Sequence, residues 1–505
     1  MKPQLLKGKK ILVTSYDLEH SEHRGIAAYS KALISCLSEA GAEVWLLTEF
    51  FDHLSESRLK FLPGKTQSII HKARILNSFA HGEKPTSVLE RKFRLARYAK
   101  IFINKFSGYT RLLVKLLRRP KIYKSKDISS FSSRDLYDNP NLRIQRLDYM
   151  ECVTGIVSAP DIYLSSKLAA KLPSLQPVKI DLNGFDALIT TCPLNIRPIN
   201  IAKFVQTIHD LIPLEYAPQN EDQLIFSHRL QACMLARRMF VSQSTANKYA
   251  AYIHTPEKAD FLRKNNQTYI SYETVIVQPP SLRFPTLLSK GQEKIFDIPP
   301  ASYLFRDETL DLKSTAKLTP FRYFLFNSSV ESRKNPLFLV KAYVESGLVN
   351  KGIKLCITGK LKNDQYSQSL KKILDYESGI ILTDYVDESC RLDLYLNALA
   401  LLSPSLVEGF GIPVLDAACL GMPTLASDCK SHLEISALHD FAEHVLCLNT
   451  LASRKWAAAM QAVADNSREL VDQAAQIRCK RIARYCRFQS MIKNQLKKDL
   501  VAILN

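Results

Sequence analysis

The chain begins and ends in alternating strand and helix patterns, and this alternation limits the folds it can adopt more than any other feature. Residues 9–16, KKILVTSY, form an apolar run typical of a buried strand. Residues 22–50 then give a glycine-containing loop, a helical pattern whose apolar face includes Ala28, Leu33 and Leu37, and a second apolar run. A strand–helix–strand unit of this kind predicts a parallel sheet.

A second alternating region begins at FRYFLFNSS, residues 321–329, and continues to about residue 480. A single domain usually spans about 100–200 residues, so two such regions in 505 residues predict two α/β domains with Rossmann-like parallel sheets. The expected organisation is a first domain over 1–300, a linker region over the pattern-poor stretch 285–318, a second domain over 319–482, and a C-terminal helix over 483–505 that packs back on the first domain.

The positive charge is concentrated in an insertion that we place at about residues 51–180. Residues 51–130 hold 19 Lys and Arg against 5 Asp and Glu, so they contribute +14 of the net charge of +20. Within them, residues 88–126 mix apolar and cationic side chains, as in an amphipathic helix on an anionic membrane surface. The alternative is a solvated helical excursion whose apolar face packs on the first domain.

The cysteines and the apolar runs bear on the compartment. The 11 cysteines are spread from Cys36 to Cys486 without a CxxC pair, which favours reduced thiols in a cytoplasmic protein over a disulfide framework or a zinc site. The apolar stretch after the basic N-terminus is too short for a signal peptide, and no run approaches the roughly 18 apolar residues of a spanning helix. We expect a cytoplasmic protein, with peripheral attachment to the inner face of the membrane through residues 88–126 as an option.

The stretch SPSLVEGFGIPVLDAACLGMPTLAS, residues 403–427, carries the chemistry. An apolar strand ends at its start, and a glycine-rich loop then leads into a helix with Pro413 in its first turn and Gly421 past its last. Such a helix start binds anions, because its N–H groups are free and glycines let the backbone approach the ligand. Two carboxylates on either side, Glu408 and Asp416, would repel a phosphate and are better suited to accept hydrogen bonds from hydroxyls. The predicted ligand is a phosphate flanked by two polyols.

A nucleotide sugar is such a ligand, and residues 404–427 resemble the donor-site motif of the retaining family 4 glycosyltransferases, which have the GT-B fold. The resemblance covers roughly residues 8–50 and 185–485, whereas residues 51 to about 180 show none. Further stretches match this family in order: GIAAYSKALISCLSEAGAEVWLLT, IHDLIPL, SSVESRKNP and TDYVDESCRLDLYLNALALLSPS. This resemblance implies two Rossmann-like domains whose parallel sheets face a central cleft.

The resemblance assigns roles around the glycine-rich loop. Glu408 is expected to contact hydroxyls of the donor sugar, and Asp416 the ribose, although the family usually has a Glu there, one methylene longer. The backbone of the loop would hold the sugar and the phosphate. The remaining donor-binding residues implied here are Gly25, Gly409, Phe410, Gly411 and Ile412, with Gly25 lying against the diphosphate from the first domain.

The segment SSVESRKNP supplies the positive charge for the departing nucleoside diphosphate. Lys334 precedes a helix start at Asn335 and Pro336, where side-chain charge and helix dipole act together. The family often has an Arg at the position of Ser329, and we expect Arg333 to take its place, since a guanidinium binds phosphate in a bidentate manner. The sequence has no Asp-x-Asp pair, so we predict a site without a metal and a protein without a cofactor.

Four further residues complete the predicted site. His209 follows an apolar strand in QTIHDLIPL and should face the cleft, where the resemblance implies contact with the donor sugar or its oxocarbenium-like transition state. The resemblance and the ends of two other strands suggest donor-binding roles for Gly359, Tyr385 and Val386, the last two at the nucleobase. The alternatives without a ligand are a His209 that only forms hydrogen bonds within the protein, and strand-end side chains such as Tyr385 that pack in the core.

The function expected from these residues is the transfer of a hexose, such as mannose, from a nucleoside-diphosphate sugar to a glycan acceptor with retention of the anomeric configuration. The expected process is surface polysaccharide synthesis, and a lipid-linked glycan is one option for the acceptor. One alternative is a nucleotide-sugar-binding scaffold without turnover, which the departures at Asp416 and Ser329 motivate. A nucleic-acid-binding protein is a further alternative, motivated by charge alone. We expect no nucleic acid as partner, because the sequence has no nucleic-acid-binding module.

Overall fold

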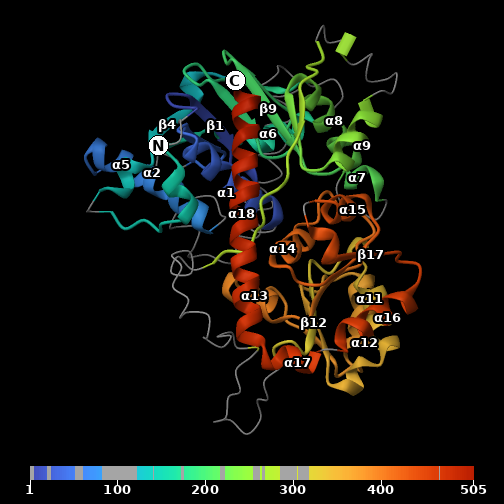
Figure 1. Ribbon diagram of the computed structural model, residues 1–505. Coiled ribbons are helices and arrows are strands. Elements are labelled where there is room, and N and C mark those ends of the chain that lie inside the picture. Colours follow the sequence, from blue (N-terminus) through green and yellow to red (C-terminus); the bar gives the residue numbers. More distant parts are fainter. Residues whose placement is uncertain are drawn as a thin grey trace.

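The structure of the protein is a computed structural model, and the chain forms two domains and a long helix that runs beside both (Figure 1). The described residues are 5–19, 24–51, 61–81, 122–139, 142–171, 176–216, 222–253, 262–263, 268–284, 304, 318–438, 440–465 and 467–505. Among these residues, no helix is both long enough and apolar enough to cross a membrane.

The first domain is built on an eight-stranded sheet in the order β11-β10-β9-β7-β1-β2-β5-β4. All neighbouring strands are parallel except β4 and β5. The strands are β1 (Lys10–Thr14), β2 (Glu43–Thr48), β4 (Ser129–Ser132), β5 (Gly155–Ser158), β7 (Ala187–Thr190), β9 (Lys203–Ile208), β10 (Arg237–Phe240) and β11 (Glu273–Val275). A smaller parallel sheet holds β3 (Ile122–Tyr123), β6 (Val178–Asp181) and β8 (Ile196–Ile199).

The first sheet is covered on both faces, which is why the central strand β1 is apolar on both of its sides. Ile11 and Val13 enter one hydrophobic cluster, whereas Leu12 enters another. The described residues of this domain form the helices α1 (Arg24–Glu39), α2 (Gly64–His81), α5 (Arg134–Tyr137), α6 (Ile162–Ala169), α7 (Ile212–Glu215), α8 (Gln223–Ala232) and α9 (Gln243–Ile253).

The second domain has a six-stranded, fully parallel sheet in the order β14-β13-β12-β15-β16-β17. Its elements are β12 (Tyr323–Asn327), α11 (Pro336–Ser346), β13 (Lys354–Thr358), α12 (Gln365–Leu374), β14 (Ile380–Leu382), α13 (Glu388–Asn397), β15 (Ala400–Ser403), α14 (Ile412–Leu420), β16 (Thr424–Ser427), α15 (Lys430–Ser436), β17 (Val445–Leu448), α16 (Ser453–Ala464) and α17 (Ser467–Asp472). Leu325 packs into one core cluster and its neighbours Phe324 and Phe326 into another, so this sheet is also covered on both faces.

Helix α18 (Ala474–Leu504) extends along both domains (Figure 1). Its first half contributes Ile482, Tyr485, Phe488 and Ile492 to the core of the second domain. Its last turns contribute Leu496, Leu500, Ile503 and Leu504 to the core of the first domain. The helix begins at Ala474 rather than at residue 483, because the apolar positions recur at helical spacing from Ile477 onward.

The insertion is shorter than the sequence suggested. Strand β5, which lies within 51–180, pairs with β2 in the main sheet, and β3 and β6 also lie in that range. These strands are two to four residues long and too short for their period to be recognised in the sequence. Most of the expected linker, and residues 88–121 of the expected membrane-binding helix, lie outside the described residues.

Candidate active site

The predicted site residues follow the carboxyl ends of strands in both sheets. Ser329 comes after β12, Gly359 after β13, Tyr385 after β14 and Glu408 after β15, while His209 comes directly after β9 in the first domain. Parallel strands end at the same edge of their sheet, and ligands of such sheets bind outside that edge. The predicted residues therefore gather on one edge of each domain.

The two edges meet at Gly409. A Cβ atom at this position would overlap the carbonyl oxygen of His209 and would lie 2.8 Å from Cβ of Asp210. Nearby, a Cβ at Gly25 of α1 would lie 3.5 Å from Cδ1 of Ile412, the first residue of α14. The loop of the donor motif thus touches the first domain backbone to backbone, which only glycine permits at residue 409.

Hydroxyl groups from both domains hold the Gly409 carbonyl. Ser242 Oγ and Thr245 Oγ1 of the first domain donate to this oxygen at 2.9 and 3.3 Å, and Ser431 Oγ of α15 donates to it at 3.2 Å. A second link is Glu434 of α15, whose carboxylate accepts the N–H groups of residues 243 and 244 at the start of α9. Sequence reasoning missed these residues. The segment SQST, residues 242–245 at the start of α9, was the one available signal, since Ser and Thr favour helix starts.

Glu408 and Lys334 form an ion pair at this junction. Lys334 Nζ donates to Glu408 Oε1, and Arg333 Nη1 lies 3.7 Å from Glu408 Oε2. Both members of the pair are only 8% exposed. Burial alone would raise the pKa of Glu408, but Lys334, Arg333 and His432 lower it to about 2. Burial lowers the pKa of Lys334, against the attraction of Glu408. The sequence placed these two residues in one site, and the structure brings them into contact.

The cations stand in a turn that precedes α11. Arg333 and Lys334 belong to a short 3-10 turn, Asn335 follows in the left-handed conformation with φ 59°, and Pro336 is the first residue of α11. Arg333 Nε also donates to Glu331 at 2.9 Å. The turn is tied to the donor-motif loop by the N–H of Leu406, which donates to the carbonyl of Arg333 at 2.8 Å.

The start of α14 has the local features from which the anion site was predicted, and the anion site itself stays a prediction. Gly411 has φ 106°, a conformation that favours glycine, and Pro413 lies in the first turn of the helix. A Cβ at Gly411 would lie 2.9 Å from the His432 ring, so the space beside the helix start is restricted. Phe410 is buried in the core of the second domain, and this packing holds the loop in place.

Asp416 does not share this site. Its Oδ1 accepts the N–H of Ser281 at 2.6 Å and the hydroxyl of Tyr485 at 3.0 Å, and its Oδ2 accepts Ser281 Oγ at 2.6 Å. The residue is 1% exposed, and burial raises the pKa of its carboxyl group. The structure therefore contradicts the predicted exposure to a ribose. Asp416 thus binds both Ser281, in the segment that follows the first domain, and Tyr485 of helix α18.

His209 is also differently placed from the prediction. Its Nε2–H donates to the carbonyl of Thr191 at 2.7 Å, and its Nδ1 accepts from Gln278 Nε2 at 3.0 Å. Tyr29 packs edge-on against the ring. Both ring nitrogens are thus used inside the first domain, and burial lowers the pKa of the ring, which favours the neutral form. The part of His209 that reaches the second domain is its carbonyl, beside Gly409.

The four remaining predicted residues, Ser329, Gly359, Tyr385 and Val386, follow strands β12, β13 and β14 of the second domain. Gly359 lies so close to β12 that a Cβ would overlap the carbonyl of Ser328, and its N–H donates to the backbone carbonyl of Asp384 at 3.1 Å. Tyr385 is half exposed, whereas Val386 is buried in the core and does not line an open surface. Ser329 is partly exposed beside β12.

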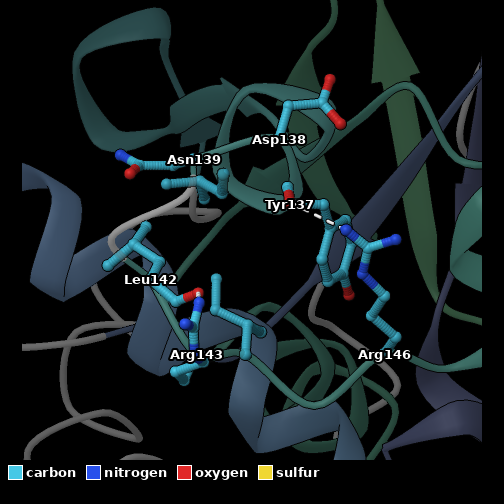
Figure 2. Close-up of a pocket in the computed structure, with 8 residues that line it drawn as sticks. Tyr137, Asp138, Asn139, Leu142, Arg143 and Arg146 are labelled. Atoms are coloured by element: carbon cyan, nitrogen blue, oxygen red, sulfur yellow. Dashed lines mark hydrogen bonds between the residues drawn. The ribbon is translucent and has the colours of Figure 1, made fainter.

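A surface pocket of about 520 Å³ lies elsewhere, in the first domain around α5 (Figure 2). It is lined by Leu136, Tyr137, Asp138, Asn139, Leu142, Arg143, Ile144 and Arg146, and none of the predicted site residues contributes to it. Across the described parts of both domains, no three His, Cys, Asp or Glu side chains are grouped as a metal site would require. The absence of a metal requirement stays a prediction.

Comparison with known proteins gives one family and several structures. Residues 307–478 match the sequence model of the family described as Glycosyl transferases group 1. No curated protein sequence matches the chain. TarM of S. aureus is 12% identical, covers 99% of both chains and has a TM-score of 0.51. Sucrose-phosphate synthase from Thermosynechococcus elongatus is 13% identical over 98% of this chain and 99% of its own, with a TM-score of 0.48. HepE from Anabaena, in complex with UDP-glucose, is 12% identical over 98% and 99%, with a TM-score of 0.45.

These findings confirm the predicted fold class. The likeness to TarM extends over nearly the whole of both chains, and the two parallel sheets with facing carboxyl edges are the GT-B arrangement. The family match covers the second domain, with the Lys334 turn and the Glu408 loop inside it. The second domain thus matches the sequence model of glycosyl transferases group 1, while the likeness to solved structures shows the fold alone.

Proposed function

We propose that this protein is a retaining glycosyltransferase that transfers a hexose from a nucleoside-diphosphate sugar to a glycan acceptor. The observation that carries the proposal is the Glu408–Lys334 pair, which lies at the junction of the two carboxyl edges and beside the start of α14. A nucleotide sugar requires a carboxylate that accepts hydrogen bonds from the sugar hydroxyls. It also requires a cation and a helix start that bind the phosphate.

The proposed chemistry needs few reacting groups from the protein. The acceptor hydroxyl attacks the anomeric carbon on the face from which the nucleotide leaves, and the departing phosphate oxygen takes the acceptor proton. Lys334, Arg333 and the α14 helix start stabilise the negative charge on the leaving diphosphate. Glu408 exchanges its bond to Lys334 for bonds to sugar hydroxyls, which frees the ammonium group for phosphate.

His209 has a supporting part in this proposal. Because both of its ring nitrogens are hydrogen-bonded to Thr191 and Gln278, we assign the ring to holding the backbone of residues 209 and 210 against Gly409. The contact of the His209 ring with the sugar, expected from the sequence, is not part of the proposed mechanism.

The test is transfer by the purified protein. UDP-, GDP-, ADP- and TDP-sugars are supplied with a glycolipid extract, and release of nucleoside diphosphate is followed with and without the extract. We expect release that depends on the extract in wild type, and a loss of at least about a hundredfold in Glu408→Ala, in line with removing one key transition-state contact. Glu469→Ala, an exposed Glu on α17, is the control and should keep full activity. Undiminished turnover in a folded Glu408→Ala protein would refute the assignment.

A nucleotide-sugar-binding scaffold is the second candidate. The burial of Asp416 under Ser281 and Tyr485 favours it, since this chain then lacks the second carboxylate at the donor. The same assay separates the two candidates. A scaffold binds a nucleotide sugar but never releases nucleoside diphosphate in response to an acceptor.

We further propose a lipid-linked acceptor, as in surface polysaccharide synthesis, with the basic residues 88–126 against anionic lipid. The support is the sequence, where cations and apolar residues alternate in this stretch. Sedimentation with phosphatidylglycerol vesicles should carry the protein down at low salt and release it at high salt. Equal recovery with phosphatidylcholine vesicles would contradict this attachment.

A further inference from the structure

Asp210 is the carboxylate that the first domain presents at the junction. It lies two residues after the end of β9, and its Cβ stands against the backbone of Gly409, so that a Cβ on that glycine would be 2.8 Å away. Glu408 directly precedes Gly409 in the sequence, so it lies one residue from this contact. Asp210 and Glu408 approach the same place from opposite domains.

The carboxylate of Asp210 is only half used. Oδ1 accepts the N–H of Ile212 at 3.1 Å, which caps the turn that follows. Within the described residues no further hydrogen bond or ion pair reaches this side chain, and it is partly exposed. The other acidic groups near the junction are all engaged: Glu408 with Lys334, Glu331 with Arg333 and Lys362, and Asp416 with Ser281 and Tyr485.

The surroundings determine what Asp210 can bind. Burial raises the pKa of its carboxyl group, Arg333 lowers it, and Glu408 and Glu215 raise it. A carboxylate beside Glu408 repels a phosphate, so Asp210 is unsuited to the diphosphate of a donor. An open carboxylate oxygen of this kind is suited to a neutral hydroxyl, which donates a charge-assisted hydrogen bond.

We propose that Asp210 Oδ2 accepts a hydrogen bond from a hydroxyl of the sugar held at Glu408, which makes Asp210 a specificity-determining residue of the donor site. This inference rests on the proposed function. It divides recognition between the domains: the second domain binds the nucleotide, and the first domain reads the sugar. Because Asp210 meets the site only where Gly409 touches the first domain, the sugar rather than the nucleotide favours the closed arrangement of the domains.

The test compares affinities for a nucleotide and for the matching nucleotide sugar. Calorimetric titrations use UDP with UDP-glucose and GDP with GDP-mannose, on wild type, Asp210→Asn and the control Glu215→Gln. Asparagine keeps an oxygen for the N–H of Ile212, so the turn and the fold are retained. Glu215 lies in the same segment, at the end of α7, and pairs with Lys248 on the surface.

We expect Asp210→Asn to bind the nucleoside diphosphate as wild type does and the nucleotide sugar about 10–100-fold more weakly, the loss typical of one hydrogen bond to a charged group. Glu215→Gln should change neither affinity. Equal affinity of Asp210→Asn and wild type for the nucleotide sugar would overturn the inference, as would equal losses for both ligands. If wild type binds neither these four ligands nor any ADP- or TDP-sugar, the proposed function fails first, and the assignment of Asp210 fails with it.

Discussion

Glu408 and Lys334 of the second domain form a buried pair of opposite charges next to the contact that Gly409 makes with the first domain. Removing two charges from water costs several kcal/mol, and a buried pair recovers this only through close geometry and further hydrogen bonds. An apolar pair of similar volume would often be as stable. The pair is therefore better explained by the ligand it can bind than by the stability of the fold.

The pair also predicts how stability depends on pH. The pKa of Glu408 falls from 4.5 to about 2 in the folded protein, so its contribution is complete above pH 4.5 and is lost as the pH falls toward 2. We expect the free energy of unfolding in urea to drop between pH 6 and pH 3 more steeply in wild type than in Glu408→Gln/Lys334→Met. Glu39, whose pKa is also lowered to about 2, titrates in both proteins and cancels in the comparison. Identical slopes would contradict the ion pair.

Single residues were predictable where their role is local. The loop glycines, Pro413 and Gly421 lie where the helix signals put them, because these signals act within a few residues. Asp416 was not predictable, since its partner Ser281 is 135 residues away in the chain. His209 was predicted at the right edge, but the partners of its ring come from two other segments of the first domain.

At the scale of elements, α14 and α18 depend on each other. Asp416 of α14 receives hydrogen bonds from Ser281 and Tyr485, and Tyr485 in turn accepts the N–H of Leu282 at 2.7 Å. Arg391 of α13 donates to the carbonyl of Ser281 at 2.8 Å. The segment that leaves the first domain is thereby fixed to α13 and α14 of the second domain and to α18.

This network predicts a structural rather than a ligand-binding role for Asp416. Asp416→Asn replaces a charged acceptor of three hydrogen bonds, and we expect it to lower the free energy of unfolding by about 1–3 kcal/mol. Affinity for a nucleoside diphosphate should stay within about twofold of wild type by calorimetry. A large loss of nucleotide affinity at unchanged stability would instead restore the ribose contact.

The far end of α18 shows how the helix is held to the first domain. Lys9, Lys203 and Arg237 precede or begin strands of the first sheet, and their side chains donate to the last carbonyls of the helix. Cations at this end also complement the helix dipole. The sequence analysis predicted a C-terminal helix that packs on the first domain. These three cations lie up to 495 residues from their partners and could not be matched to them from the sequence.

At the scale of the whole molecule, the two sheets direct their carboxyl edges at each other. The contacts between the described parts of these edges include the Gly409 backbone, the hydroxyls that donate to its carbonyl, and Glu434 of α15, which accepts N–H groups at the start of α9. The hydroxyls of Tyr216 and Ser332 form a further hydrogen bond at 2.9 Å. The two-domain plan was predictable from the alternation of elements and from the resemblance. The closeness of the edges was not, because it depends on side chains from four separate segments.

Gly409→Ala tests this closeness. Its new methyl group would overlap the carbonyl oxygen of His209, a backbone atom that can move away only if the domains separate. We expect an unchanged far-ultraviolet circular dichroism spectrum, a larger radius of gyration by X-ray scattering, and loss of transfer. Gly64→Ala is the matched control, since a Cβ there has open space. Scattering and activity equal to wild type would show that the edges do not meet at Gly409.

The most direct measurement is thermal unfolding of wild type and of Glu408→Gln/Lys334→Met in the presence of UDP-, GDP-, ADP- and TDP-sugars. A ligand at 100 times its dissociation constant stabilises the folded state by about 2.7 kcal/mol. At least one of these donors should raise the unfolding temperature of wild type and leave that of the double variant unchanged. If none stabilises wild type, or if both proteins are stabilised equally, nucleotide sugars do not bind between the two sheet edges.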